Sequence, residues 1–304
     1  MRTRRSLIDL SDLAAGEIDE IFERTKYFES TRPSRSLEDV ACVNMFFEHS
    51  TRTMTSFTLA EQRLGANVIT IWPSQSSLAK GETIEDTAIT LGAMGIQVLV
   101  IRHPEDGFPA RVALAFDGHV VNAGDGTHAH PTQALLDLYT LREEFGELNG
   151  RTVAIVGDVE HSRVARSSVH GLQALGADVV LVGPAGFLAS DFMPGKARIE
   201  RDFDAVLRVA DAVVVLRIQR ERFATMPLSN DEYVARYQLN GKRLKTMRPH
   251  AIVMHPGPYN RGVEIDESVL EFAGWRYAKQ VMHGVGIRMA VLDFLVNRDR
   301  AVAR

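Results

Sequence analysis

The sequence predicts an α/β protein with two doubly wound parallel-sheet domains and a site in the cleft between them. The chain has 304 residues, which corresponds to roughly two domains of about 150 residues each. Strand-like runs alternate with helical patterns in the first half, and the alternation restarts in the second half. The most distinctive polar residues follow directly after strand-like runs. Ligands of open α/β sheets bind beyond the carboxyl ends of the strands, so these residues are the candidates for a site.

The first half of the chain combines one early helix with three expected strands. Residues 6–30 have the pattern of an amphipathic helix. Apolar runs with the density of buried strands follow at 43–47, 67–71 and 98–102. A strong helical pattern then covers 131–144 and ends near Gly146, and we interpret this helix as the connection between the two halves.

The second half repeats the alternation of strands and helices. The expected strands are 151–156, 179–182, 212–216 and 251–254. The expected helices are 163–175 and, as a closing element, 285–296. No tandem repeat or low-complexity segment interrupts this order, so both halves read as ordinary α/β units.

Composition excludes several classes of protein. The chain is 45% apolar and 24% charged, as in ordinary globular proteins, and its formal net charge of -4 gives no reason to expect a nucleic acid partner. No apolar run approaches the ~20 residues of a membrane span, and acidic residues follow the basic segment 1–5 at once, so neither a membrane nor a signal segment is expected.

Cys42 is the single cysteine, so a reducing, cytoplasmic location is expected. A catalytic thiol is the alternative for Cys42, although no basic residue flanks it.

The segment Ser50-Thr51-Arg52-Thr53 lies where an expected strand turns into a helix. The first N–H groups of a helix have no partner within it, and the helix dipole is positive at that end. Three hydroxyl groups and a guanidinium added there make a seat for a phosphate or a similar anion. An ordinary Ser/Thr cap followed by a surface arginine is the alternative interpretation.

Two further cationic residues follow in the first half. Lys80 is the single lysine of a polar loop from Ser76 to Thr83, which is either a solvated loop or a mobile one that delivers a cation to a dianionic ligand. Arg102 stands at the end of an expected strand, where arginines usually form surface ion pairs.

Two patterns suggest a metal or a nucleotide cofactor, and neither is complete. His128 and His130 have the spacing of metal ligands, but no third ligand follows at a convincing offset. Gly157-Asp158 follows an apolar strand as in dinucleotide-binding proteins, but the three-glycine fingerprint is absent. We therefore predict no metal and no cofactor.

Ordered motifs from about Phe46 to Leu292 resemble those of the aspartate and ornithine carbamoyltransferases. They are Phe46 to Phe57, Ser76 to Glu82, Arg102-His103-Pro104, His130-Pro131-Thr132-Gln133, Gly157 to Ser167, Arg217-Ile218-Gln219 and Met254 to Gly262. Thr132 and His255-Pro256-Gly257-Pro258 follow the aspartate form, since ornithine enzymes usually carry Cys at the first position and His-Cys-Leu-Pro at the second. Arg163 and Arg217 would also suit the two carboxylates of aspartate.

The resemblance implies transfer of a carbamoyl group from carbamoyl phosphate to L-aspartate, a step of de novo pyrimidine biosynthesis. The implied catalytic residues are Arg52, Thr53, Arg102 and His130. The implied ligands of carbamoyl phosphate are Ser50, Thr51, Arg52, Thr53, Ser76, Lys80, Arg102, His130 and Gln133. The implied ligands of aspartate are Lys80, Arg163, Arg217, Gln219, Pro256, Gly257 and Pro258.

The resemblance also implies how the chain is organised and assembled. Residues 1–134, completed by a C-terminal helix at about 286–304, would form the carbamoyl-phosphate-binding domain, and 135–285 the aspartate-binding domain. The expected assembly is a homotrimer in which Ser76 and Lys80 act in the site of a neighbouring subunit. A regulatory chain or a dihydroorotase is a possible further partner. A cis Gly257–Pro258 bond is expected, as are ion pairs that join Glu48 to Arg163 and Arg222 across the cleft on closure.

Two positions depart from the family pattern, and the one that matters is Met54; the other, His49, where the family commonly has Ala or Pro, is minor. Met54 stands where the family usually has a second arginine, which removes a positive charge next to the expected phosphate seat. Two alternatives therefore stay open: a carbamoyltransferase for another amine such as ornithine, and a non-catalytic homologue.

Overall fold

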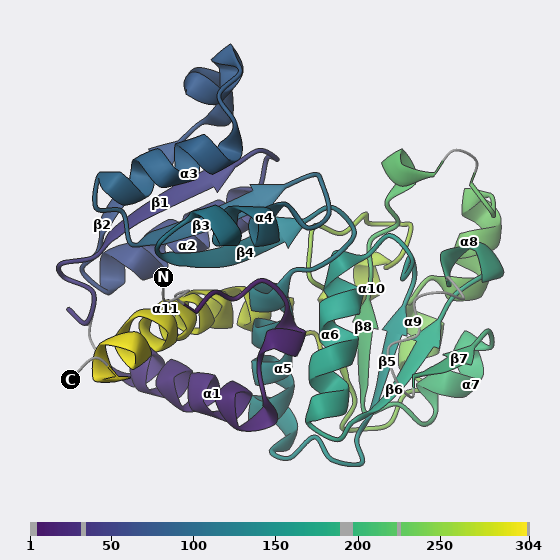
Figure 1. The fold of residues 1–304 in the computed structure, drawn as a ribbon. Coiled ribbons are helices and arrows are strands. Elements are labelled where there is room, and N and C mark those ends of the chain that lie inside the picture. Colours follow the sequence, from purple (N-terminus) through teal and green to yellow (C-terminus); the bar gives the residue numbers. More distant parts are fainter. Residues whose placement is uncertain (1–4, 32–34, 189–196, 224–225, 303–304) are drawn as a thin grey trace. The chain divides into compact units, whose positions relative to one another are not determined.

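The computed structural model describes residues 5–31, 35–188, 197–223 and 226–302, which divide into two compact units (Figure 1). Unit 1 comprises residues 1–136 and 281–304, and unit 2 comprises residues 137–280. Each unit contains one parallel sheet with helices packed against it. The predicted fold class, α/β with two parallel-sheet domains, is confirmed.

The sheet of unit 1 has four parallel strands in the order β2-β1-β3-β4. Its strands are β1 (Ala41–Phe46), β2 (Asn67–Ile71), β3 (Val98–His103) and β4 (His119–Asp125). The fourth strand was not predicted. All seven residues of β4 are buried, but its sequence includes His119, Asn122 and Gly124, which are more typical of turns than of strands.

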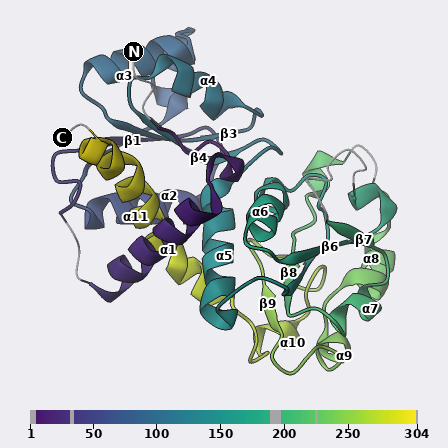
Figure 2. The same ribbon diagram turned by 60° about the horizontal axis from the view of Figure 1, so that its bottom comes forward.

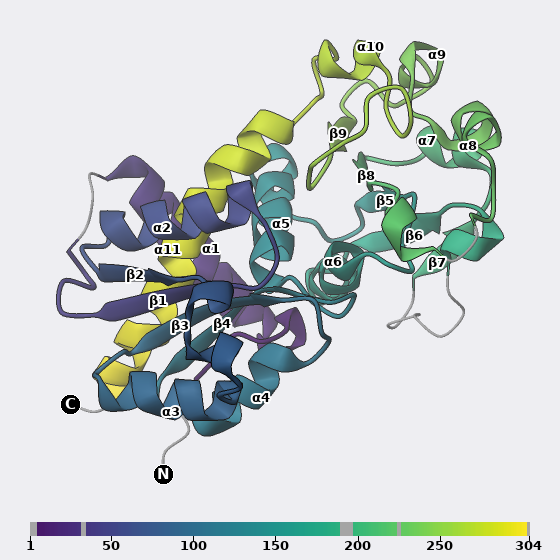
Figure 3. The same cartoon turned by 90° about the horizontal axis from the view of Figure 1, so that it is seen from above.

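Helices cover both faces of this sheet, as Figure 3 shows with α3 and α4 on one side and α2 on the other. The helices of unit 1 are α1 (Ala15–Ser30), α2 (Thr51–Arg63), α3 (Ile84–Ala93) and α4 (Phe108–Ala115). Two further helices, α5 (Pro131–Phe145) and α11 (Tyr277–Val302), contribute residues to both units. One hydrophobic core joins β1 and β3 to α3 and α4. Parallel strands covered on both faces read as continuous apolar runs, which is why β1 and β3 were predictable.

The predicted helix at 6–30 begins later than expected. Leu7 pairs instead with Val121 of β4, and a short 3-10 helix, Leu10–Asp12, follows. The α-helix starts at Ala15, where the Glu17 carboxylate accepts a hydrogen bond from the Ala14 N–H. The N-terminal residues therefore extend the edge of the sheet before the helix begins.

The sheet of unit 2 has five parallel strands in the order β7-β6-β5-β8-β9. Figure 2 shows β6, β7, β8 and β9 of this sheet. Its strands are β5 (Thr152–Val156), β6 (Asp178–Val182), β7 (Arg198–Glu200), β8 (Ala212–Val215) and β9 (Ile252–Met254). Its helices are α6 (Arg163–Ala174), α7 (Phe203–Leu207), α8 (Asn230–Tyr237), α9 (Gly241–Leu244) and α10 (Glu267–Leu270). The short edge strand β7 was not predicted, because its three residues are all exposed and carry no apolar pattern.

No helix of the described residues is both long enough and apolar enough to cross a membrane.

Candidate active site

The turn from β1 into α2 carries the expected anion seat. Ser50 is the N-cap of α2, and in the described structure its side chain makes no capping hydrogen bond. The Met54 N–H donates to the Ser50 carbonyl at 3.1 Å, so the N–H groups of residues 51–53 precede the helical ladder. Thr51 and Arg52 are exposed, whereas Thr53 is buried. A ligand at this turn would meet backbone donors, hydroxyl groups and one guanidinium.

Strand register brings Arg102 next to this turn. Phe46 of β1 pairs with Arg102 of β3, and the Phe47 N–H donates to the Arg102 carbonyl at 2.9 Å. The Arg102 guanidinium Nε lies 3.2 Å from Glu48 Oε2, and its Nη1 donates to the Ala123 carbonyl at 3.3 Å. Arg102 is therefore held at the carboxyl end of the sheet by a neighbouring carboxylate and by the β4 backbone.

The loop after β4 carries His130 and leads to Gln133, two further predicted residues of unit 1. Ile101 of β3 pairs with Asn122 of β4, so the segment that leads to His130 starts beside Arg102. His130 is buried, and its carbonyl accepts the N–H groups of Gln133 and Ala134 at the start of α5. The carboxyl ends of β1, β3 and β4 thus bring together three segments that are far apart in the sequence: Ser50 to Thr53, Arg102, and His130 to Gln133.

Asp125 organises this loop, and its role was not foreseen from the sequence. Its buried carboxylate accepts hydrogen bonds from Asn122 Nδ2 at 2.8 Å and from the N–H groups of Gly107 at 2.7 Å and Ala129 at 3.0 Å. Burial alone would raise the pKa of Asp125, but bonds from His128, Asn122 and Gly107 outweigh it and hold the pKa below its ordinary value. The bond to Asp125 in turn raises the pKa of His128.

These contacts bear on the alternatives of metal binding and thiol chemistry. His128 Nδ1 lies 3.0 Å from Asp125 Oδ2, so it has a structural partner in the loop. Across the described ranges, no group of three or more His, Cys, Asp or Glu residues is arranged to hold a metal ion. Cys42 is buried, and burial raises the pKa of its thiol, which makes it a poor nucleophile.

Ser76 and Lys80 lie on a loop of two short 3-10 helices, Pro73–Gln75 and Ser77–Lys80, which projects beyond β2 and α3 in Figure 1. Lys80 is exposed, and the Ser76 hydroxyl donates to the Pro73 carbonyl at 2.9 Å. The base of the loop is held by Glu82, which accepts hydrogen bonds from Ser77 and Thr87. The loop therefore presents its lysine to solvent on a fixed base.

In unit 2, Asp158 ties two predicted segments together. Its buried carboxylate lies 2.8 Å from His161 Nδ1 and accepts the Gln219 N–H at 3.3 Å. The Gln219 side chain donates to the His161 carbonyl at 2.7 Å. Burial raises the pKa of Asp158 in spite of these bonds. The segments after β5 and after β8 are thereby fixed side by side.

Arg163 and Arg217 stand at this same end of the unit 2 sheet. Arg163 is the first residue of α6, whose N-cap Ser162 accepts the Ala165 N–H at 3.1 Å. Arg217 follows β8 and forms an ion pair with Glu221, whose pKa is lowered by the Arg217 guanidinium. Unit 2 thus carries Arg163 and Arg217 on two segments that Asp158 and Gln219 hold together.

The loop after β9 contains the predicted cis bond between Gly257 and Pro258. Gly257 has a φ of 65°, a left-handed conformation that residues with a side chain rarely adopt. Its N–H donates to His255 Nδ1 at 2.8 Å. Pro256, Gly257 and Pro258 therefore form a constrained turn after β9.

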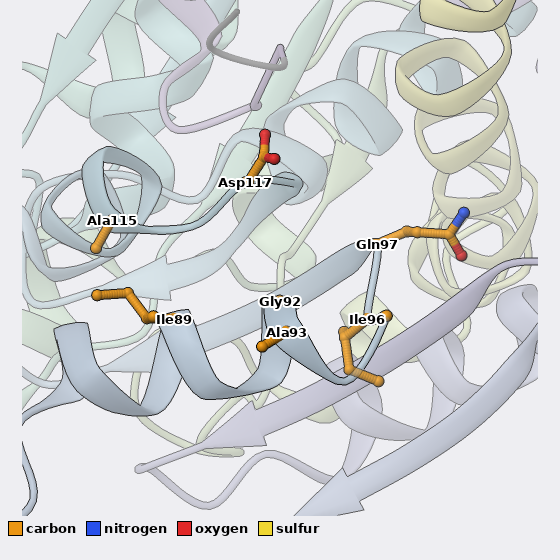
Figure 4. Close-up of a pocket in the computed structure, with 8 residues that line it drawn as sticks. Ile89, Gly92, Ala93, Ile96, Gln97, Ala115 and Asp117 are labelled. Carbon is orange, nitrogen blue, oxygen red and sulfur yellow. The ribbon is translucent and has the colours of Figure 1, made fainter. Parts of the chain in front are cut away.

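A cavity of about 360 Å³ in unit 1 is lined by none of these residues; Figure 4 shows the residues that line it. Its lining includes Ile89 of α3, Ala115 of α4, and Gln97, which precedes β3. It therefore opens near the amino end of β3, whereas Arg102 lies near the carboxyl end, so this cavity is not the candidate site.

Two parallel α/β units with hydroxyl and arginine side chains at the carboxyl ends of their strands are typical of an enzyme that acts on small anionic substrates. The chain belongs to the aspartate/ornithine carbamoyltransferase family. The family's carbamoyl-P binding domain matches residues 5–143, and its Asp/Orn binding domain matches residues 149–295. The resemblance seen in the motifs is thereby confirmed.

Similar proteins cover nearly the whole chain. The aspartate carbamoyltransferase catalytic subunit of Salinispora tropica is 47% identical over 302 residues, which is 96% of this chain and 98% of that protein. The catalytic subunit from Gluconacetobacter diazotrophicus is 52% identical over 254 residues, 83% of this chain and 79% of that protein.

The solved structures with a similar fold are also of aspartate transcarbamoylases. The Trypanosoma cruzi aspartate transcarbamoylase in complex with N-(phosphonacetyl)-L-aspartic acid has a TM-score of 0.87 and 28% identity, with 95% of both chains covered. The catalytic subunit of the M. jannaschii enzyme has a TM-score of 0.86 and 33% identity, with 97% of this chain and 99% of that chain covered.

Proposed function

We propose that this chain transfers the carbamoyl group of carbamoyl phosphate to the amino group of L-aspartate, giving N-carbamoyl-L-aspartate and phosphate in de novo pyrimidine biosynthesis. One observation carries the proposal: residues matching the family motifs stand at the carboxyl ends of β1, β3 and β4 in unit 1 and of β5, β8 and β9 in unit 2. The relatives named aspartate carbamoyltransferase catalytic subunit support the aspartate form.

The residues of unit 1 suit the carbamoyl donor. The N–H groups and hydroxyls of Ser50, Thr51 and Thr53, with Arg52, would bind its phosphate. Attack on the carbonyl builds negative charge on the oxygen, which Arg102, His130 and Thr53 would stabilise as fixed donors. Gln133 would bind the carbamoyl amide.

The residues of unit 2 suit a dicarboxylate acceptor. Arg163 and Arg217 would each bind one carboxylate, with Gln219 beside Arg217. The carbonyls of Pro256 and Gly257, in the turn closed by Pro258, would accept hydrogen bonds from the amine. No side chain has to act as a nucleophile, because holding both substrates in reactive geometry supplies much of the acceleration.

Turnover of the purified chain with carbamoyl phosphate tests the proposal. We expect N-carbamoyl-aspartate with L-aspartate and no product with ornithine, because two arginines would repel a cationic side chain. Product from ornithine alone would instead establish the alternative acceptor, and no turnover with either amine would indicate a non-catalytic homologue.

We further propose a homotrimer with shared sites, in which Ser76 and Lys80 serve a neighbouring subunit. The projecting loop that carries them follows edge strand β2, where Ile69 and Trp72 are 46% and 44% exposed, as suits a surface that packs against another copy. A cytoplasmic location, and association with a regulatory chain or a dihydroorotase, belong to the same proposal.

Subunit mixing tests the shared site. Arg52→Ala and Lys80→Ala subunits should each be inactive alone, because each removes one cation from every site. Dissociated and reassociated at equal amounts, they should recover roughly a quarter of the wild-type rate, since each mixed cyclic trimer regains one of three sites. A mixture as inactive as its parents would show that Lys80 serves its own chain.

Replacing Met54 by arginine should strengthen the binding of carbamoyl phosphate. Met54 lies in the first turn of α2, so Met54→Arg places a cation beside the proposed phosphate seat. We expect the KM for carbamoyl phosphate to fall about 3–10-fold at low salt and the gain to shrink as salt is added. Thr55→Arg, at the exposed neighbouring position, is the matched control and should change this KM little. An equal effect of both variants would contradict a specific role for position 54.

A further inference from the structure

Two buried ionisable residues flank the turn after β9 and have no part in the chemistry described so far. His255 is 1% exposed and Glu264 is 0% exposed. His255 directly follows β9, and Glu264 precedes Ile265, which forms bridges with Leu239 and Arg261. The segment between them contains Pro256, Gly257 and Pro258. Burying two such groups is unfavourable unless each has polar partners.

The contacts of His255 determine where its ring proton lies. A backbone N–H can only donate, so His255 Nδ1 must accept the hydrogen bond from Gly257 at 2.8 Å. The proton of the neutral imidazole is then on Nε2. His255 Nε2 lies 3.6 Å from Glu264 Oε1, which is too long for a full hydrogen bond but close enough for direct electrostatic attraction. The ring thus connects the Gly257 backbone with the Glu264 carboxylate.

His255 is also fixed through its own backbone. Its N–H donates to Gln280 Oε1 at 3.0 Å, and Gln280 Nε2 donates to Asp137 Oδ1 at 2.7 Å. All three of these side chains are buried. The His255 backbone is therefore anchored by buried polar side chains that lie outside the loop.

Glu264 closes the segment from its other end. Its carboxylate accepts a hydrogen bond from the Asn260 N–H, two residues after Pro258. Burial raises the pKa of the buried Tyr233 hydroxyl of α8, and the charges of Glu264 and Asp158 raise this pKa further. The turn is thus pinned at Gly257 by His255 and at Asn260 by Glu264.

We propose that His255 and Glu264 are positioning residues that hold the main-chain carbonyls of Pro256 and Gly257 toward the amino group of the acceptor substrate. The proposal rests on the proposed function, which assigns this turn to the acceptor. Gly257 adopts a backbone conformation that glycine does not maintain by itself, since glycine is the most permissive residue. A displacement of about 1 Å at such a contact can cost on the order of 100-fold in rate.

Two substitutions separate the two functions of the histidine ring. In His255→Asn the side-chain oxygen takes the place of Nδ1 and can still accept the Gly257 N–H. In His255→Gln the longer side chain reaches the place of Nε2 and can still donate to Glu264. If both contacts position the turn, each variant should raise the KM for aspartate about 10-fold or more. The KM for carbamoyl phosphate should stay within about 2-fold of wild type, because all its proposed ligands lie in unit 1, either of the same chain or, for Ser76 and Lys80, of the neighbouring subunit.

Glu264 provides an independent test. Glu264→Gln keeps an acceptor oxygen for Asn260 and His255 and should change the KM for aspartate less than about 3-fold, whereas Glu264→Leu removes the acceptor and should raise it about 10-fold or more. His119→Asn is the matched control. His119 is also buried, and its Nδ1 lies 2.8 Å from the Arg5 carbonyl in unit 1, so this variant should lower stability without changing the KM for aspartate.

The outcomes distinguish this inference from the proposed function. A wild-type protein without aspartate turnover overturns the proposed function itself. Normal wild-type turnover, with an aspartate KM unchanged in His255→Asn, His255→Gln and Glu264→Leu, overturns the positioning proposal. So does an equal rise in the KM values of both substrates, because a general structural defect would produce that. A selective rise for aspartate, with recovery in Glu264→Gln, supports it.

Discussion

An Arg52→Ala variant should lose about 10³-fold in kcat while it keeps or slightly gains stability. The loss is expected because Arg52 is the guanidinium of the proposed phosphate seat, and removing one fixed donor from developing charge costs about 10²–10³-fold. The small gain in stability is expected because Arg52 lies in the first turn of α2, where a cation is repelled by the positive end of the helix dipole. Its exposed side chain also buries little apolar surface. An arginine at a position where it destabilises the helix is best explained by a role in binding an anionic ligand.

Arg63 is the matched control, because it is the last residue of the same helix and is also exposed. A cation there interacts favourably with the helix dipole, so Arg63→Ala should lower the free energy of unfolding by about 0.3–1 kcal/mol and leave kcat unchanged. The measurements are steady-state kinetics and urea unfolding of both variants. Equal activity of Arg52→Ala and Arg63→Ala would refute the phosphate seat, and a large stability loss in Arg52→Ala would show that Arg52 supports the fold.

Much of the fold was predictable because its strands are covered on both faces. Strands β1, β3 and β5 are almost entirely buried, so their sequences are continuous apolar runs that stand out from amphipathic helices. Strands β4 and β7 were missed for opposite reasons. The β4 sequence is buried but polar, since His119 and Asn122 find partners in the N-terminal segment, and β7 is exposed throughout. The spacing of apolar residues reveals neither a buried strand whose polar side chains have partners nor a strand that is exposed on both faces.

For the candidate site, the motif residues could be predicted from the sequence, but the residues that hold the motifs in place could not. The residues proposed to bind the substrates lie in local motifs at strand ends, so the sequence alone points to them. The residues that hold those motifs in place could not be found in this way. Asp125 takes hydrogen bonds from Gly107, and Asp158 takes one from Gln219. These are contacts between segments far apart in the chain, and a single sequence does not show which strands are neighbours.

Glu61 illustrates the same limit and leads to the second large effect. It lies on α2 with no exposed surface, and its Oε2 accepts a hydrogen bond from Asn44 Nδ2 of β1 at 2.7 Å. Burial raises the pKa of Glu61 from 4.5 to about 8, and the Asn44 bond lowers it only in part. Burial also raises the pKa of the Cys42 thiol, and the Glu61 charge adds to that. The face of β1 toward α2 therefore holds a carboxyl group that stays protonated at neutral pH.

The sign of the resulting pH dependence follows from proton binding. Between pH 4.5 and about pH 8, the folded protein keeps a proton on Glu61 that the unfolded chain has released. The contribution of Glu61 to the free energy of unfolding therefore falls by about 1.4 kcal/mol per pH unit in this window, or on the order of 5 kcal/mol in total. Below the window Glu61 is neutral in both states, so its full contribution to stability is present there and is lost as the pH rises.

Glu61→Gln should remove this dependence, because the amide stays neutral at every pH and still accepts a hydrogen bond from Asn44. Urea unfolding from pH 5 to pH 9 should show nearly equal midpoints for variant and wild type at pH 5. The variant should become progressively more stable as the pH rises, by several kcal/mol near pH 8. Glu23→Gln at an exposed position of α1 should show no such divergence, because that carboxylate is hydrated in both states. Parallel curves for Glu61→Gln and wild type would mean that Glu61 is already ionised in the folded protein, and that the space between β1 and α2 admits enough water or charge to hold it so.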